Sequence, residues 1–164
     1  MPTVCVRVPA ETFDQGAKDL LASGITDACA RAEGIPDDPA RRIGSWVLID
    51  EVAEGCWFAG GARDALAAFV PIVVQVYPPA GVLDADRREI LVRGISSAVD
   101  AALSDEKRKA QTSVVILEVP EGHWGVREKI IGLKQHAALW GYEHLEHLVT
   151  GAAVTMDTAP QLAE

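Results

Sequence analysis

The chain of 164 residues has little of several features that would assign it to a specialised class of protein. It contains only three cysteines, an odd number at scattered positions, which fits a reducing compartment better than a disulfide framework. No apolar run approaches the length needed to cross a membrane, and no basic segment followed by an apolar one stands at the amino terminus. We therefore expect a soluble, cytoplasmic protein that does not bind a membrane.

Positive charge is also scarce. The 15 Lys and Arg residues are outnumbered by 24 Asp and Glu residues, which gives a formal net charge of −9. Because nucleic-acid phosphates attract the opposite sign, we do not expect the chain to bind nucleic acid. An anionic substrate would need a local group of cations. The sequence also lacks a glycine-rich phosphate loop, a nucleophile elbow and a complete set of metal ligands, so we expect no cofactor and no metal.

What the sequence does contain is a repeat. Three segments of the first half recur in the same order in the second half. The sequence offset between the two members of a pair differs by only a few residues from one pair to the next. The pairs are Pro2–Ala10 with Pro71–Pro79, Gly24–Ala28 with Gly94–Ala98, and Val47–Trp57 with Val114–Trp124. Three ordered matches are not expected by chance, so the sequence predicts a duplicated unit.

Each copy of the unit predicts a strand, a helix and a second strand. Strands are indicated by alternating or strand-prone residues, and helices by apolar residues at helical spacing. Each helical segment follows a capping signal, which is a Thr12/Gln15 capping box in the first copy and Asp84 in the second. The predicted strands cover 3–8, 46–52, 72–77 and 113–119, and the predicted helices cover about 12–32 and the segment from Asp84 to Ala102.

These elements predict an α/β fold of the two-layer (α+β) kind. Parallel strands joined by a helix require a right-handed crossover, so two units give a four-stranded sheet with both helices on one face. We expect a single domain over 1–150, with pseudo-repeats at 2–61 and 71–128, a C-terminal helix at 128–148 and a tail at 151–164. The opposite sheet face would stay uncovered, which favours self-association in a closed ring.

Pro2 is the candidate catalytic residue. If Met1 is removed, Pro2 becomes a secondary amine at the chain terminus, and an unperturbed α-amino group titrates near ~7.7–8.0. Burial or a nearby cation would leave this amine neutral and basic at physiological pH. Proline is common enough to stand at this position without a function. The repeat that begins at Pro2 is what favours the catalytic interpretation.

These residues and motifs resemble the tautomerase superfamily, whose members are built from strand, helix, strand units and use an amino-terminal proline. The segment Glu118–Gly125 resembles the end of the unit in 4-oxalocrotonate tautomerase, and Pro2–Gly61 resembles the start of fused, double-length members typified by cis-3-chloroacrylic acid dehalogenase. The resemblance covers about residues 2–128. It implies a homotrimer in which the proline lies at the base of a pocket for a small carboxylate-bearing substrate, near a subunit boundary.

Several positions depart from the family pattern. The arginine that follows the first strand in the short tautomerases corresponds to Thr12, and the helix histidine of the dehalogenase corresponds to Cys29. The tyrosine and the water-activating glutamate of the dehalogenase fall near Val115 and Val126. The carboxylate clamp and the water-activating acid of cis-dehalogenation are therefore missing from their family positions.

Four further residues are candidates for substrate binding. Arg7 lies on the face of the first strand opposite to its valines, and Arg127 follows the turn motif of the second copy. Trp57 and Trp124 occupy equivalent turn positions, and one of them resembles a phenylalanine that lines the pocket of the short tautomerases. Each has a structural alternative: an interface arginine for Arg7, a solvated turn for Arg127, and interface packing for the tryptophans.

The combined prediction is a tautomerase-like isomerase in which neutral Pro2 moves a proton between oxygen and carbon of a small enol or keto acid. In a second enzymatic alternative, Pro2 acts as a cation or an imine-forming amine in hydration, dehalogenation or decarboxylation of an unsaturated or β-keto acid. A third alternative is a trimer of the same fold that binds a ligand or partner without turnover.

Overall fold

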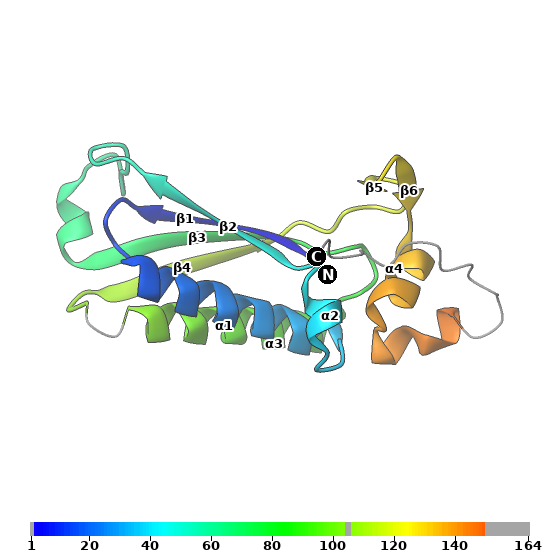
Figure 1. The fold of residues 1–164 in the computed structure, drawn as a ribbon. Coiled ribbons are helices and arrows are strands. Elements are labelled where there is room, and N and C mark those ends of the chain that lie inside the picture. Colours follow the sequence, from blue (N-terminus) through cyan, green and yellow to red (C-terminus); the bar gives the residue numbers. More distant parts are fainter. Residues whose placement is uncertain (1, 104–105, 150–164) are drawn as a thin grey trace.

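The computed structural model describes residues 2–103 and 106–149. Helices α1 (Gln15–Glu33) and α3 (Ala85–Ala102) cover one face of a four-stranded sheet, as Figure 1 shows. The strands are β1 (Thr3–Pro9), β2 (Trp46–Val52), β3 (Phe69–Tyr77) and β4 (Lys109–Ile116), in the order β2-β1-β3-β4. The predicted two-layer fold is confirmed.

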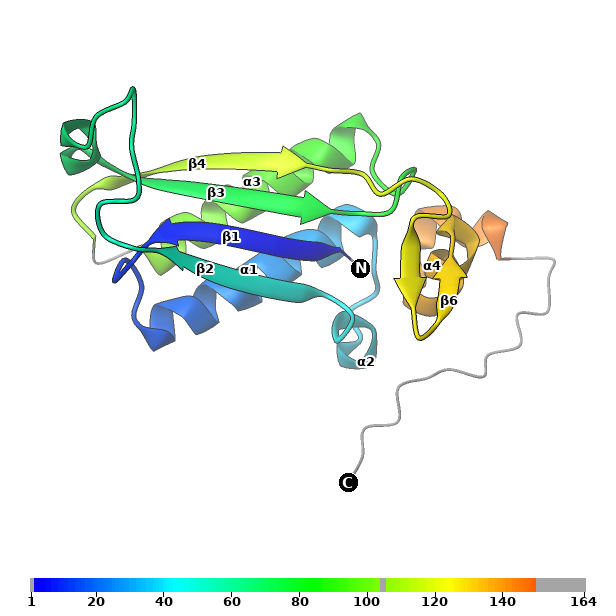
Figure 2. The same cartoon turned by 90° about the horizontal axis from the view of Figure 1, so that it is seen from above.

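Strand pairing follows the duplicated unit. β1 pairs in parallel with β2, β3 pairs in parallel with β4, and an antiparallel pairing of β1 with β3 joins the two units. Thr3 therefore lies between Trp46 at the start of β2 and Tyr77 at the end of β3. One end of the sheet thus brings the start of β1 together with the segments that leave β3 and β4 (Figure 2).

Alternation along the strands separates buried from exposed side chains. On β1, Val4, Val6 and Val8 face the helices and are fully buried, whereas Arg7 lies on the other face and is exposed. No described helix covers that second face (Figure 1), and Trp46 of β2 is 67% exposed there. The predicted uncovered face is therefore present in the single chain.

The two helices approach each other through small residues of the repeated segments. A Cβ atom added to Gly24 of α1 would lie 2.7 Å from the Cβ of Ala98 in α3, and a Cβ added to Gly94 of α3 would lie 2.7 Å from the Cβ of Ala28 in α1. Each glycine therefore packs on the alanine of the other unit. This reciprocal contact gives a physical reason for the same glycine and alanine in both copies.

α1 begins later than the sequence predicts. Its first residue is Gln15, and the N-cap is Asp14, whose carboxylate accepts a hydrogen bond from the Ala17 N–H at 2.8 Å. Thr12 does not cap the helix, because its hydroxyl donates to the Pro9 carbonyl at 2.6 Å and so stabilises the preceding turn instead. In the second unit, Asp84 caps α3 as predicted.

The predicted helix at 128–148 is wrong. The chain instead forms a hairpin of β5 (Trp124–Val126) and β6 (Lys129–Ile131), then α4 (Leu133–Trp140) and a 3-10 helix (Glu143–Leu148). Two glycines divide the segment: Gly132 precedes α4 in an extended conformation, and Gly141 ends α4 with a φ of 68°. The apolar residues on which the prediction rested are divided among these short elements. The predicted tail at 151–164 lies outside the described residues.

The C-terminal elements dock at the end of the sheet where β1 begins (Figure 2). The Glu143 N–H donates to the Gly34 carbonyl at 3.0 Å, directly behind α1. Arg41, in α2 (Pro39–Arg42), donates to the Trp140 carbonyl at 3.3 Å. α4 and the 3-10 helix thereby close this end of the two-layer body. Among the described residues, no helix has the length and apolar character that a membrane span requires.

Gly24→Ala is expected to destabilise the fold, because the new methyl group would push α1 away from α3. Overpacking of this kind typically costs ~1–3 kcal/mol, and we expect the free energy of unfolding in urea to fall by about that amount.

Gly16→Ala is the matched control. A Cβ at Gly16 would meet only a carboxylate oxygen of Asp14, at 3.5 Å, so the lost freedom of the unfolded chain should leave stability unchanged or raise it. Equal unfolding free energies for Gly24→Ala and the wild type would contradict the close helix contact.

Candidate active site

Pro2 stands at the closed end of the body and is buried. Because Thr3 pairs with Tyr77, the antiparallel register carries Pro2 to the level of Pro78. The next residue, Pro79, forms an isolated bridge with Val119 after β4. Pro2 is therefore beside the segments that continue from β3 and β4 toward the hairpin.

A buried carboxyl group lies at the same end. Glu33, the last residue of α1, is only 1% exposed, and it accepts a hydrogen bond from the Tyr142 hydroxyl. Burial raises the pKa of Glu33, while the positive amino terminus and the Tyr142 hydrogen bond oppose the rise. Burial beside Glu33 also raises the pKa of Tyr142. The amino group that acts on Glu33 here is that of Met1, and removal of Met1 would transfer this terminal charge to the Pro2 nitrogen.

His136 of α4 is the second buried titratable group here, at 2% exposed. Its ring packs edge-on against Trp124 of β5, with ring centroids 5.1 Å apart and planes at 80°. Neither ring nitrogen has a hydrogen-bond partner in the described part of the chain. Burial, followed by the positive charge of the amino terminus, lowers the pKa of His136 to about 4. The ring is therefore neutral at pH 7.

A small recess opens beside His136, between the segments after β3 and β4, the β5–β6 hairpin and the start of α4. It encloses about 160 Å³, including space open to solvent. Its apolar lining comes from Pro79, Val119, Pro120, Trp124, Ile131 and Leu133, and Glu121 and His136 are its titratable residues. Ligand pockets usually span ~300–1,000 Å³, whereas this recess has enclosed room for only about one water molecule, so within a single chain it is too small to hold a ligand.

The two predicted tryptophans lie at opposite ends of the sheet. Trp124 lines the recess and contacts His136. Trp57 lies in the loop after β2, and β2 ends beside Pro9 rather than beside the start of β1. Within one chain, the structure therefore brings Trp124 but not Trp57 to the Pro2 end.

The two predicted arginines do not line the recess. Arg7 lies on the uncovered sheet face, where it donates to Gln75 at 3.0 Å and forms an ion pair with Asp50 at 3.9 Å. Arg127 is exposed in the turn between β5 and β6, with a φ of 46°. Neither guanidinium supplies a cation to the recess of its own chain.

The arginines of α2 are held by carboxylates. Arg42 forms ion pairs with Asp27 and Asp37, and Arg41 forms one with Asp38 at 3.5 Å. Neither lines the recess. These contacts anchor α2 to α1 and to the connecting loop, so the cations closest in sequence to β2 have a structural role.

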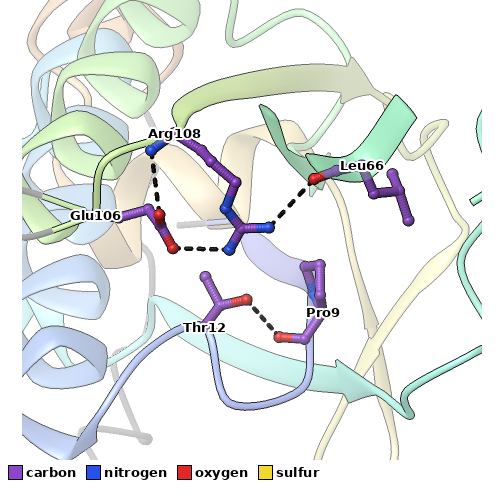
Figure 3. Close-up of polar contacts among 5 residues, drawn as sticks. All are labelled: Pro9, Thr12, Leu66, Glu106 and Arg108. Atoms are coloured by element: carbon purple, nitrogen blue, oxygen red, sulfur yellow. Dashed lines mark hydrogen bonds and ion pairs between the residues drawn. The ribbon is translucent and has the colours of Figure 1, made fainter. Parts of the chain in front are cut away.

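The corresponding end of the second unit has no terminal amine, because Pro71 lies inside β3. There Arg108 donates to the Glu106 carboxylate at 2.7 Å and to the Leu66 carbonyl at 3.2 Å, as Figure 3 shows. These bonds from Arg108 lower the pKa of Glu106 to about 2. Arg108 is thus occupied by internal partners at this end of the sheet.

The described residues contain no group of three or more His, Cys, Asp or Glu side chains that could hold a metal ion. His144, one of the histidines near the end of the described chain, donates from Nε2 to the Val82 carbonyl at 2.9 Å. Cys29 is fully buried on α1, and burial raises the pKa of its thiol, so it is suited to packing rather than to nucleophilic chemistry.

Sequence analysis did not find Glu33 or His136. The sequence does contain a signal for Glu33. It stands four residues after Cys29, so it lies on the same buried face of α1 although it is a charged residue. His136 similarly follows Leu133 by three residues on α4. A titratable residue on a predicted apolar stripe is the pattern that identifies both.

Glu33→Gln is expected to change the pH dependence of stability. Because burial raises the pKa of Glu33 above its ordinary value of 4.5, the folded state holds the proton more tightly than the unfolded state. The wild type should therefore lose stability relative to Glu33→Gln as pH rises from about 4.5 toward the raised pKa. Thermal unfolding of both proteins between pH 4 and 8 measures this difference.

Glu89→Gln serves as the control, because Glu89 is an exposed partner of Arg93 on α3. If the melting temperatures of Glu33→Gln and the wild type stay parallel across the pH range, the buried carboxyl does not have the environment described above.

A family described as "Tautomerase enzyme" matches residues 2–65 and 73–134, which together make up most of the chain. No curated protein matches the chain.

Solved structures show the same fold. Native fused 4-OT is 23% identical, with a TM-score of 0.63, over 84% of this chain and 98% of that chain. A wild-type fused 4-OT asymmetric trimer is 22% identical, with a TM-score of 0.63, over 78% and 94%. A protein inactivated by 2-oxo-3-pentynoate is 18% identical, with a TM-score of 0.62, over 78% and 94%.

Proposed function

Because this chain belongs to the tautomerase family, we propose that it moves a proton between oxygen and carbon of a small enol or keto acid, with Pro2 as the general base. The observation that carries the proposal is the position of Pro2, buried at the start of β1 and beside the recess that Trp124 and His136 line. The proposal requires removal of Met1, which would leave a secondary amine.

In this mechanism the Pro2 nitrogen takes the proton from the enol oxygen and returns it to carbon. The O–H bond breaks as an N–H bond forms, and the N–H bond then breaks as the new C–H bond forms. Negative charge develops on the oxygen during the transfer, so hydrogen-bond donors fixed around that oxygen would lower the barrier. Burial strengthens such electrostatic interactions because little water screens them.

In the chain that begins at Met1, Glu33 interacts with the terminal amino group, and once Met1 is removed Glu33 would influence the protonation of the Pro2 nitrogen instead. When the carboxyl is un-ionised, which its burial favours, it leaves the amine free to be neutral, as a base must be. When the carboxyl is ionised, it would instead hold the amine as a cation. The two groups would then titrate as a coupled pair, so a substitution at Glu33 should alter the pH range in which Pro2 is a base.

The same carboxyl favours one alternative reaction class. A cationic Pro2 beside ionised Glu33 would act as an acid in hydration, dehalogenation or decarboxylation of an unsaturated or β-keto acid. An imine-forming Pro2 belongs to the same alternative, and borohydride reduction would trap its adduct with the substrate. A trapped adduct would favour decarboxylation over simple proton transfer.

We also propose that the working unit is a homotrimer. The uncovered sheet face exposes Trp46 and Leu48, which are 67% and 47% exposed, and a second copy would bury them. The fused 4-OT relative is a trimer. In such an assembly Arg7, Arg127 and Trp57, which do not reach the recess of their own chain, would be available to a neighbouring site.

Pro2→Ala is expected to lower kcat/KM for ketonisation of phenylenolpyruvate or 2-hydroxymuconate by about 10²–10⁴-fold, the usual contribution of a general base. Stopped-flow absorbance at the enol band measures the rate. Circular dichroism should show the same fold, because the substitution stands before β1.

Pro71→Ala is the matched control, since Pro71 is the counterpart of Pro2 in the second unit and lies inside β3 without a free amine. Folded Pro71→Ala should keep the wild-type rate. Full activity of Pro2→Ala would refute the proposed role. Wild-type protein that binds these acids without turning them over would support the non-catalytic alternative.

A further inference from the structure

Tyr142 lies in the part of the chain that follows the residues matched to the tautomerase family, which end at Lys134. It stands between α4 and the 3-10 helix, and its side chain is fully buried. The next residue, Glu143, donates its N–H to the Gly34 carbonyl at 3.0 Å. Because Gly34 directly follows Glu33, this backbone bond fixes the chain around Tyr142 beside the carboxyl end of α1.

The Tyr142 hydroxyl is a hydrogen-bond donor to the Glu33 carboxyl. Glu33 is only 1% exposed, so solvent does not take the place of this donor. A hydroxyl that donates to a carboxyl group favours its ionised form, whereas burial favours its protonated form. Tyr142 therefore opposes the effect of burial on Glu33, and the terminal amino group acts in the same direction as Tyr142.

The buried titratable neighbours of Glu33 are neutral at pH 7. Cys29 stands one turn earlier on α1, and burial, followed by Glu33, raises the pKa of its thiol, so the thiol keeps its proton. His136 of α4 is neutral because burial, followed by the amino terminus, lowers its pKa to about 4. Glu143 on the 3-10 helix is exposed to solvent. None of these three side chains adds a buried charge beside the carboxyl.

The cations around this end have other partners. Arg87 of α3 donates to the Ala32 carbonyl at 2.9 Å and forms an ion pair with Asp84 at 3.6 Å. His144 donates from Nε2 to the Val82 carbonyl at 2.9 Å, and both arginines of α2 pair with aspartates. Tyr142 and the terminal amine are the two groups that act to ionise the buried carboxyl.

We propose that Tyr142 is a positioning residue for the general base: it holds the Glu33 carboxylate toward the terminal nitrogen, which lets the buried Pro2 amine take up a proton at physiological pH. The inference rests on the proposed function of Pro2 and on the removal of Met1, which passes the terminal charge to Pro2. Burial alone disfavours a cationic amine and would make Pro2 a weak base, since base strength falls with the pKa. The Tyr142–Glu33 pair offsets this loss.

Tyr142 acts on Pro2 through Glu33 and without contact with the substrate. When the Pro2 nitrogen takes a proton from the enol, the ionised Glu33 carboxylate stabilises the resulting cation. The Tyr142 hydroxyl stabilises that carboxylate by its hydrogen bond. The hydroxyl keeps its own proton throughout, because burial, followed by Glu33, raises the pKa of Tyr142 well above its ordinary value.

Titration of the Pro2 nitrogen tests the inference without a substrate. The measurement uses ¹⁵N-proline-labelled protein whose mass shows that Met1 is absent. Tyr142→Phe keeps the buried ring but removes the donor, and we expect the pKa of the Pro2 nitrogen to fall by about one unit, the usual effect of one hydrogen bond to a charged group. An unchanged or raised pKa in the folded variant would overturn the inference.

A double substitution shows whether Tyr142 acts through Glu33. We expect Glu33→Gln to lower the pKa of the Pro2 nitrogen at least as much as Tyr142→Phe does, and the double variant to match Glu33→Gln alone. If adding Tyr142→Phe to Glu33→Gln lowers this pKa further, Tyr142 acts independently of the carboxyl and the inference is wrong.

Leu145→Ala is the matched control for looser packing, because Leu145 is a buried apolar side chain of the same 3-10 helix. This variant should lose thermal stability and keep the wild-type pKa of the Pro2 nitrogen. An equal fall of the pKa in Leu145→Ala and Tyr142→Phe would count against the inference, because loosening of the segment would then explain both results.

The pH profile of kcat/KM for phenylenolpyruvate gives an independent readout. The acid limb of the Tyr142→Phe profile should move to lower pH by about one unit, while the rate above the limb stays within about tenfold of the wild type. A loss of rate at every pH with an unmoved acid limb would indicate a structural role and overturn the inference. A Pro2 nitrogen still joined to Met1, or full activity of Pro2→Ala, would instead overturn the proposed function, so the two failures are distinguishable.

Discussion

The close contact of α1 with α3 is the constraint on which the rest of the structure depends. Gly24 packs on Ala98 and Gly94 packs on Ala28, so the two units meet through the same pair of residues in opposite directions. Larger residues would separate the helices and open the core above β1 and β3. The contact aligns the two units antiparallel, which places the end of α1, the start of β1 and the end of β3 together.

The duplicated unit gives the sheet two similar ends, but different residues occupy them. At one end Pro71 lies inside β3, and Arg108 is held by Glu106 and a backbone carbonyl. At the other end the chain begins, and the C-terminal elements bury Glu33 and His136 beside Pro2. The extension after the second repeat thus covers one end of the sheet and buries two titratable groups there.

The sequence predicted the repeated unit well because local periodicity and strand pairing agree in it: all four strands, both long helices and the Asp84 cap are present. It did not predict the start of β4 at Lys109, where polar residues pair with the apolar start of β3. It also predicted one helix at 128–148, where Gly132 and Gly141 give several short elements. The burial of Glu33 and His136 depends on those elements, so repeat analysis alone could not find it.

The most direct test of the central claim is the state of the Pro2 nitrogen in protein purified from its own cells. In ¹⁵N-proline-labelled protein, a free terminal nitrogen gives an amine signal that moves with pH, whereas a nitrogen still joined to Met1 gives an amide signal that does not titrate. The account predicts a titrating amine with a pKa near or below the ordinary value of ~7.7–8.0, so that its neutral form is populated at pH 7. A fixed amide signal would contradict it.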